Sequence, residues 1–210
     1  MIKFFPVTYK KLYNYFGPQR WWPAKTPFEV MVGAILTQNT SWQNVEKAIK
    51  NLKKHKLLSP GKLNKLKNNS LALRIKPAGY YNVKAKRLKN FIDFLFKEFG
   101  ADIGKMRLAE PLDLRKKLIA VNGIGQETAD SILLYALNKP VFVVDAYTRR
   151  ILCRHGKAKK DAAYEEIQGL FVKNLRNNAK LFNEYHALLV RLGKEFCFKN
   201  DPQCKECPLK

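Results

Sequence analysis

Apolar residues recur at intervals of three and four positions through almost the whole chain, which is the spacing of one face of an α-helix. Thr26-Pro27-Phe28-Glu29 begins one such pattern with a capping box and a proline at the first helical position. Gly100 ends another pattern, at the position where a left-handed residue commonly stops a helix. The one candidate strand, Val141–Val144, lies between a proline and an aspartate and is more typical of a buried connector. The sequence therefore predicts an all-α fold.

The charge of the chain constrains its partner. Lysine and arginine number 40 against 17 acidic residues among 210, a formal net charge of +23. This excess favours a polyanion, either nucleic acid or an anionic membrane surface. No apolar run approaches the ~18 residues of a membrane span, and the first residues lack the apolar run of a secretory signal. We therefore expect a cytoplasmic, nucleoid-associated protein that does not bind a membrane.

A glycine-rich turn, Val121-Asn122-Gly123-Ile124-Gly125, separates two helical patterns. Two glycines spaced by one residue permit a tight turn whose backbone N–H groups, at the start of the next helix, can bind a phosphate. The motif alone is equally typical of a packing corner between helices. It therefore leaves a phosphate site and a purely structural turn as alternatives.

Asp145 follows four apolar residues and precedes a helical pattern, twenty residues after Gly125. Taken alone, it is best explained as a helix N-cap. A carboxylate at a partly buried helix start can also stabilise a developing oxocarbenium ion or orient a water, as carboxylates do in glycosidic cleavage. Arg149, in the same segment, is either a phosphate contact or an ordinary surface charge.

Together these segments resemble the endonuclease III branch of the helix-hairpin-helix DNA glycosylases. The matching pieces are GIGQETAD, VVDAYTRR, Leu36-Thr37-Gln38-Asn39-Thr40, and GYYNVKA, which is similar to the family signature G-x-Y-N-x-K-A. They occur in the family's order from about residue 26 onward. The resemblance implies two helical domains with DNA between them. One is a six-helix barrel over 28–139 that contains the hairpin, and the other combines 1–27 with 140–210.

The resemblance also implies base excision from double-stranded DNA by a monomer. Enzymes of this family flip the damaged nucleotide into a pocket, because its glycosidic bond cannot be reached inside the stack. Asp145 is then the catalytic carboxylate, and Gln38 is expected to fill the gap that the flipped base leaves. The expected DNA contacts lie in the matching segments: Gln38, Lys84, Asn122, Gly123, Ile124, Gly125 and Arg149.

Glu127 departs from the pattern of the bifunctional members. Those members carry a lysine two residues after the second hairpin glycine, and its amine attacks the sugar to form a Schiff base. A carboxylate cannot form an imine. We therefore predict a monofunctional enzyme with Asp145 and Glu127 in its catalytic site, in which water attacks and an abasic site is left.

The tryptophans bear on the substrate. Trp21, Trp22 and Trp42 are either core residues or flat faces on which a flipped base stacks. Electron-rich indoles favour an electron-poor, alkylated purine. The WWP element, the TQNT segment and the glutamate after the hairpin are also similar to bacterial 3-methyladenine DNA glycosylases of the endonuclease III fold. We therefore expect these tryptophans to line the base pocket and alkylated purines to be the substrates.

Three other functions are compatible with parts of the sequence. A glycosylase/AP lyase acting on oxidised pyrimidines fits endonuclease III itself, but Glu127 argues against it. A mismatch glycosylase is favoured if the tryptophans are core residues. A non-catalytic DNA-binding module could use the hairpin alone, and the presence of Asp145 at the family's spacing argues against this.

Cys197, Cys204 and Cys207 fall in the last fourteen residues. Clustered thiols in a basic intracellular protein are typical of a metal or iron–sulfur site and not of a disulfide scaffold. The family binds a [4Fe–4S] cluster with C-x6-C-x2-C-x5-C, which places the fourth cysteine three residues beyond Lys210. We expect the cluster in a chain that continues further; a cluster with three protein ligands and its absence are the alternatives. The three histidines show no metal spacing and are assigned no role.

Overall fold

The computed structural model describes residues 4–19 and 24–210. These residues form helices and connecting turns without a strand, so the all-α prediction is confirmed. The chain divides into two compact units, Ala24–Leu137 and a unit that combines Met1–Pro23 with Asn138–Lys210. The assignment of a barrel domain to 28–139 and a second domain to 1–27 with 140–210 stays a prediction.

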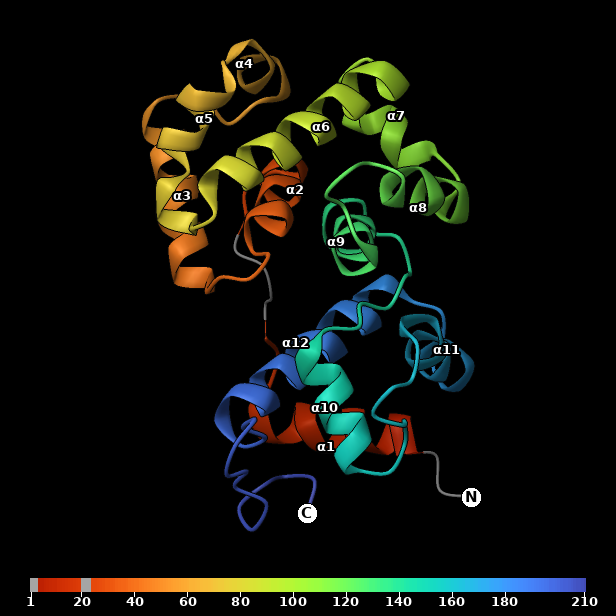
Figure 1. Cartoon of the computed structure of the whole chain (residues 1–210). Helices are drawn as coiled ribbons and strands as arrows, with labels where there is room; N and C mark the ends of the chain where they lie inside the picture. Colours follow the sequence, from red (N-terminus) through yellow and green to blue (C-terminus); the bar gives the residue numbers. More distant parts are fainter. Residues whose placement is uncertain (1–3, 20–23) are drawn as a thin grey trace. The chain divides into compact units, whose positions relative to one another are not determined.

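The unit Ala24–Leu137 is built around one apolar helix, α2, in which every residue from Phe28 to Leu36 is buried. Helices α6 and α9 and the turn after α9 pack against α2, and α4 and α5 pack against α6 (Figure 1, orange to green). The helices are α2 (Pro27–Leu36), α3 (Trp42–Lys54), α4 (Pro60–Lys65), α5 (Asn68–Arg74), α6 (Tyr81–Phe99), α7 (Ile103–Leu108), α8 (Pro111–Ile119) and α9 (Gln126–Ser131), with a 3-10 turn at Lys76–Ala78.

The expected helix boundaries at Thr26 and Gly100 are confirmed. The Thr26 hydroxyl accepts a hydrogen bond from the Glu29 N–H at 3.2 Å, and Pro27 is the first residue of α2. The Glu29 carboxylate accepts from the N–H of Lys25, one residue before the group that a capping box predicts. Gly100 ends α6 in the left-handed region, with φ of 62°. Local capping chemistry therefore sets both boundaries.

The helix expected after the hairpin changes its winding. It begins as α9 and continues as a π-helical segment over Ile132–Ala136, in which the N–H of Leu137 donates to the carbonyl of Ile132 at 3.2 Å. Four of the five residues of this segment are buried. Periodicity does not reveal such a segment, since the apolar residues keep their helical spacing across it.

The other unit packs α1 (Phe4–Phe16), α10 (Ala146–Arg154), α11 (Tyr164–Asn174) and α12 (Ala179–Glu195) around an aromatic core. The rings of Phe142 and Phe171 stack with centroids 3.6 Å apart, and the Tyr185 hydroxyl donates to the Phe5 carbonyl at 3.0 Å. Val141–Val144 forms no strand and its last three residues are buried, so the prediction of a buried connector is confirmed.

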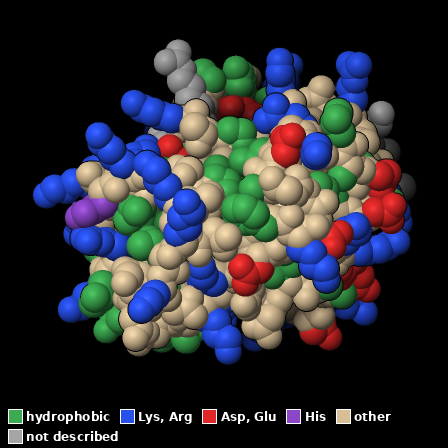
Figure 2. Space-filling view, turned by 90° about the horizontal axis from the view of Figure 1, so that it is seen from above, with side chains coloured by type: hydrophobic (Ala, Val, Ile, Leu, Met, Phe, Trp, Pro, Cys, Tyr) green, Lys and Arg blue, Asp and Glu red, His purple; other side chains and the backbone are tan. Residues whose placement is uncertain are grey.

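Basic side chains are numerous on the surface. Figure 2 shows one face on which Lys and Arg side chains are more numerous than Asp and Glu, around a smaller apolar area. Such a surface favours a polyanion through counterion release. None of the helices in the described part of the chain has the length and apolar character that a membrane crossing requires.

Candidate active site and DNA contacts

Of the two glycines in the turn between α8 and α9, only Gly123 has a backbone conformation that favours glycine. The Ile124 N–H donates to the Val121 carbonyl at 2.9 Å and closes the turn, while Gly123 adopts φ of +95°. The Ile124 side chain is buried and anchors the turn. Asn122 and Gly125 are exposed, with φ of −90° at Gly125. The turn therefore presents exposed backbone at the start of α9, which suits an anion.

A buried ion pair ties the two hairpin helices together. The Arg115 guanidinium donates to both carboxylate oxygens of Asp130, at 2.7 and 3.0 Å, and the Asp130 side chain is fully buried. This paired geometry fixes the direction of α9 relative to α8. The relative placement of the hairpin helices is thus set within this unit.

Gln38 lies against the hairpin. Its Nε2 donates to the Gly123 carbonyl and to the Thr128 hydroxyl, each at 3.0 Å, and its Oε1 accepts from Nη1 of Arg87 at 2.5 Å. The side chain is half-buried. Both ends of the Gln38 amide are therefore engaged within its own unit.

Lys84 is buried, with 1% of its surface exposed. Its ammonium donates to the Leu36 and Ala78 carbonyls, both at 2.8 Å, and so joins the end of α2 to the 3-10 turn before α6. Burial, and then the nearby Arg87, lower the pKa of Lys84 to about 8. We therefore do not retain Lys84 among the expected DNA contacts, because its charge is used in the core.

Asp145 is the N-cap of α10. Its Oδ1 accepts from the Thr148 N–H at 2.7 Å, and its Oδ2 lies 3.5 Å from Nε2 of His186, with 13% of its side chain exposed. Burial alone raises the pKa of Asp145. Electrostatic attraction by the neighbouring His186 and the hydrogen bond from the Thr148 N–H outweigh burial, so the pKa of Asp145 lies below its usual value. A mostly buried carboxylate is thus held ionised at neutral pH.

The connector before Asp145 is held from α11. Nε2 of Gln168 donates to the Phe142 carbonyl at 2.6 Å, and the Val144 N–H donates to the Tyr164 hydroxyl at 3.1 Å. These bonds satisfy polar groups of a buried, irregular backbone. They also fix the position from which the Asp145 carboxylate projects.

Arginines of α10 hold two loops of the same unit. Arg149, expected at DNA phosphate, is half-buried and donates from Nη1 to the Ala162 carbonyl. Arg150 donates to the carbonyls of Gly193 and Cys197 at 3.0 and 2.7 Å. Part of the donor capacity of Arg149 is therefore used inside the protein.

The three C-terminal cysteines lie in the loop after α12 and are free thiols. Nη1 of Arg154 donates to Sγ of Cys197 at 3.1 Å. Burial raises the pKa of the Cys207 thiol, and the neighbouring Cys197 and Cys204 sulfurs add to this rise. Across the residues that the structure describes, however, no three His, Cys, Asp or Glu side chains are grouped closely enough to hold a metal ion. The three thiols suit three of the four ligand positions of an iron–sulfur cluster, but in this structure they do not form a ligand set.

The remaining expected site residues are Glu127 and the three tryptophans. Glu127 is exposed in the first turn of α9, in the unit Ala24–Leu137, whereas Asp145 belongs to the other unit. Trp42 is the first residue of α3 and is half-buried. Trp21 and Trp22 lie outside the described residues.

Sequence reasoning missed three residues that the structure places beside expected site residues. His186 lies next to Asp145, and its position on the buried face of α12 was the available signal. Arg87 contacts Gln38 and carried no such signal. Tyr80, whose carbonyl accepts from the Lys84 N–H at 3.0 Å, is 72% exposed with φ of 44°, and its signal was an aromatic residue in the GYYNVKA segment.

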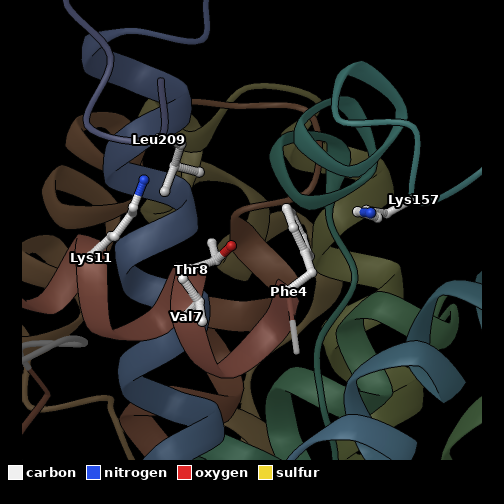
Figure 3. Close-up of a pocket in the computed structure, with 6 residues that line it drawn as sticks. All are labelled: Phe4, Val7, Thr8, Lys11, Lys157 and Leu209. Carbon is white, nitrogen blue, oxygen red and sulfur yellow. The ribbon is translucent and has the colours of Figure 1, made fainter. Parts of the chain in front are cut away.

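A surface cavity elsewhere lacks the chemistry of a glycosidic site. It is lined along α1 by Phe4, Val7, Thr8 and Lys11, and also by Lys157 and Leu209 (Figure 3). The Lys157 ammonium lies 5.0 Å from the centre of the Phe4 ring. None of these six residues carries a carboxylate or was expected in the site.

The two hairpin glycines should respond differently to alanine. At Gly123 an added Cβ would lie 2.2 Å from Cγ of Arg87 in a left-handed backbone, whereas at Gly125 it would meet no atom within 4 Å. We expect Gly123→Ala to destabilise the protein by about 1–3 kcal/mol. Gly125→Ala should leave the free energy of unfolding within ~0.5 kcal/mol and weaken duplex DNA binding. Thermal melts measure the stability of each variant, and a titration with duplex measures its DNA affinity. Equal melting temperatures of the two variants would contradict the structure.

Lys84 should make the stability depend on pH. Its pKa is lowered from 10.5 to about 8 in the folded chain, so between these values the unfolded chain binds more protons. The stability of the wild type relative to Lys84→Met should therefore rise with pH across this window, by on the order of 2 kcal/mol. Urea unfolding of both proteins at about pH 7 and about pH 10 measures this difference. A difference that stays constant would show that the folded chain does not perturb Lys84.

Comparisons with known proteins identify the family. The family model of the HhH-GPD superfamily base excision DNA repair proteins matches residues 32–177. A Methanocaldococcus jannaschii protein that carries the provisional name DNA repair glycosylase is 50% identical over 204 residues, 96% of this chain and 92% of its own. Endonuclease III of Thermotoga maritima is 30% identical over 184 residues, 88% of this chain and 81% of its own.

Solved structures show the same fold. The H. pylori 3-methyladenine DNA glycosylase MagIII, bound to 1,N6-ethenoadenine, matches with a TM-score of 0.79 and 30% identity over 90% of this chain and 96% of its own. A trapped endonuclease III–DNA covalent intermediate matches with a TM-score of 0.85 and 20% identity over 100% of this chain and 94% of its own. The chain therefore belongs to the HhH-GPD superfamily of base excision DNA repair proteins and is a DNA glycosylase.

Proposed function

We propose that this glycosylase is monofunctional, excises alkylated purines from duplex DNA and leaves an abasic site. The observation that carries the proposal is the Asp145 carboxylate, mostly buried and held ionised by Thr148 and His186. Glu127 occupies the position at which bifunctional relatives carry the imine-forming lysine. The 30% identity to MagIII, a 3-methyladenine DNA glycosylase, supports the choice of alkylated purines.

The chemistry follows from an ionised carboxylate and a charged leaving group. The C1′–N bond breaks with its electron pair going to the purine, which an alkyl group has already made cationic. The Asp145 carboxylate stabilises the positive charge that develops on the sugar. A water then bonds to C1′ and gives its proton to Asp145. No amine is required, so Glu127 is compatible with this route.

DNA contact is assigned to the hairpin and the tryptophans. Exposed backbone at Asn122 and Gly125 takes a phosphate beside the lesion, and the basic surface adds affinity that does not depend on sequence. Trp21, Trp22 and Trp42 supply the flat faces that stack on a flipped, electron-poor base. Exposed Tyr80 joins them as a candidate to enter the stack.

The C-terminal loop is assigned to a [4Fe–4S] cluster with Cys197, Cys204 and Cys207 as thiolate ligands. Soft sulfur donors at this spacing suit iron, and the cluster would supply a rigid loop and take no part in base excision. The Arg154 guanidinium, which binds Cys197 Sγ and the Phe198 carbonyl, would offset the negative charge of the thiolates.

Excision is tested with methylated duplex DNA, whose products are separated before and after hot alkali. We expect strand breaks only after alkali, and no protein–DNA adduct with borohydride. Breaks without alkali, or a borohydride adduct, would overturn the monofunctional mechanism. Activity on thymine glycol or mismatched duplexes, with none on methylated DNA, would overturn the assignment of alkylated purines.

The matched variant for this test is Asp145→Asn. Asparagine caps a helix as well as aspartate does, so α10 should keep its start. Turnover should fall about 10²–10⁴-fold, the usual contribution of a positioned carboxylate, while duplex binding is retained.

The cluster is tested by iron and sulfide analysis of the full chain purified without oxygen. We expect Cys204→Ser to lose bound iron and Cys153→Ser, outside the motif, to keep it. Visible absorption of the iron–sulfur chromophore gives an independent measure. A wild type without iron under these conditions would refute the assignment.

A further inference from the structure

Helices α3, α4 and α5 carry a dense group of positive charges within the unit Ala24–Leu137. Between positions 47 and 76 the chain has ten lysines and arginines and no acidic residue, and all ten side chains are exposed. They form what we call the α3–α5 basic cluster: Lys47, Lys50, Lys53, Lys54, Lys56, Lys62, Lys65, Lys67, Arg74 and Lys76. The net charge of the whole chain is +23, so this short segment supplies nearly half of it.

The helices project these charges into solvent. In α3, Lys47, Lys50 and Lys54 are spaced by three and four positions, so they share one side of the helix. The buried residues of α3 lie on the opposite side: Val45, Ala48, Ile49 and Leu52. In α4 only Leu63 is buried, and the exposed Lys62 and Lys65 flank it. Apolar packing therefore leaves the lysines of both helices facing outward.

Contacts between the helices hold the cluster together as one surface. Nη1 of Arg74, at the end of α5, donates to Nε2 of His55, at the end of α3, over 2.6 Å. Nδ2 of Asn51 in α3 donates to the Arg74 carbonyl at 3.4 Å. Two residues connect α4 to α5. The three helices are thus fixed to one another, and their charges with them.

The fold by itself explains only part of this charge. Lys54, Lys65 and Arg74 lie in last helical turns, where a cation offsets the helix dipole. Glu29 is the one acid of the described residues that pairs with the cluster, 2.5 Å from Lys53. Like charges within the Debye length, about 10 Å at 0.1 M salt, repel one another. A polyanion lying across the cluster would remove this repulsion and release counterions.

The cluster and the hairpin lie on different sides of α6. The Lys89 ammonium donates to the Asn64 carbonyl of α4 at 2.6 Å, whereas Asn90 donates to the Asn122 carbonyl of the hairpin at 3.0 Å. Successive helical residues point about 100° apart. Figure 1 shows the same division, with α3, α4 and α5 on one side of α6 and α8 and α9 on the other. The cluster is therefore a surface separate from the hairpin.

We propose that the α3–α5 basic cluster is a second duplex-binding surface, which holds the phosphate backbone of a DNA segment other than the one at the hairpin. Duplex DNA is the polyanion on which a DNA glycosylase works, and its charge complements the cluster. Contacts to phosphate do not depend on base sequence, so the second segment is held loosely and released readily. This inference goes beyond excision and does not depend on which base is removed.

Bridging of two duplexes tests the proposal. The full chain is titrated with short undamaged duplexes, half of them labelled with a donor dye and half with an acceptor. We expect energy transfer between the duplexes, and sedimentation should give a complex of one chain with two duplexes. Undamaged DNA contains no substrate base, so failure of the alkylpurine assignment leaves the result readable.

A charge-matched pair of variants locates the second surface. The cluster variant combines Lys50→Gln, Lys54→Gln, Lys62→Gln and Lys65→Gln. The control variant removes four exposed charges of the other unit: Lys10→Gln, Lys173→Gln, Arg176→Gln and Lys180→Gln. Glutamine favours a helix about as well as lysine, so both variants should keep the wild-type melting temperature.

Only the cluster variant should lose the second duplex. We expect its affinity for that duplex to fall at least tenfold, and the salt dependence of log K for that step to decrease by about 3, because four phosphate contacts are lost. Its affinity for the first duplex should match that of the control variant.

Three outcomes would overturn the proposal. One duplex per wild-type chain would show that no second surface exists. Equal losses in the two variants would show that net charge acts without a defined surface. Binding to phosphatidylglycerol vesicles that is lost in the cluster variant, with no bridging of DNA by the wild type, would assign the cluster to an anionic membrane instead.

Discussion

Helix ends leave backbone groups without intrahelical partners, and this structure depends on polar side chains that satisfy them. The buried Lys84 ammonium binds the Leu36 carbonyl at the end of α2 together with that of Ala78. In the other unit the Arg150 guanidinium binds the Gly193 carbonyl near the end of α12. Such bonds fix the turns between helices, and these turns carry the residues of the proposed site. Rigid connections therefore come from charged groups as well as from apolar packing.

Asp145 also satisfies a backbone group at a helix end, and the same carboxylate supplies the proposed chemistry. Its Oδ1 satisfies the Thr148 N–H at the start of α10, and its Oδ2 faces His186. The contacts that cap the helix also favour the ionised form of the acid. A helix cap and a catalytic carboxylate are thus compatible descriptions of this residue, because N-cap geometry both orients the carboxylate and keeps it charged.

Much of the fold was predictable from local patterns, whereas the contacts of the site were not. Thr26 and Gly100 act on groups within one turn of themselves, so their neighbours in the sequence reveal their roles. Gln38 and Gly123 are 85 positions apart, and Lys84 and Leu36 are 48 apart. The local sequence around a polar residue in a loop or on a helix is the same whether its side chain contacts solvent, DNA or a distant carbonyl. The resemblance to a family located Gln38, Lys84 and Gly123 and implied that they contact DNA, but it did not indicate their contacts within the folded chain.

The sequence by itself determined the helical pattern, its caps, the basic charge and the order of the glycosylase motifs, because each depends on residue type and short spacing. The tertiary structure alone decided that Lys84 is buried, that the Gln38 amide is engaged by Arg87, and that His186 lies beside Asp145. The physical reason is the desolvation of polar groups. Once packing buries a carbonyl or a carboxylate, the nearest donor must pair with it, and only the folded chain specifies which donor that is.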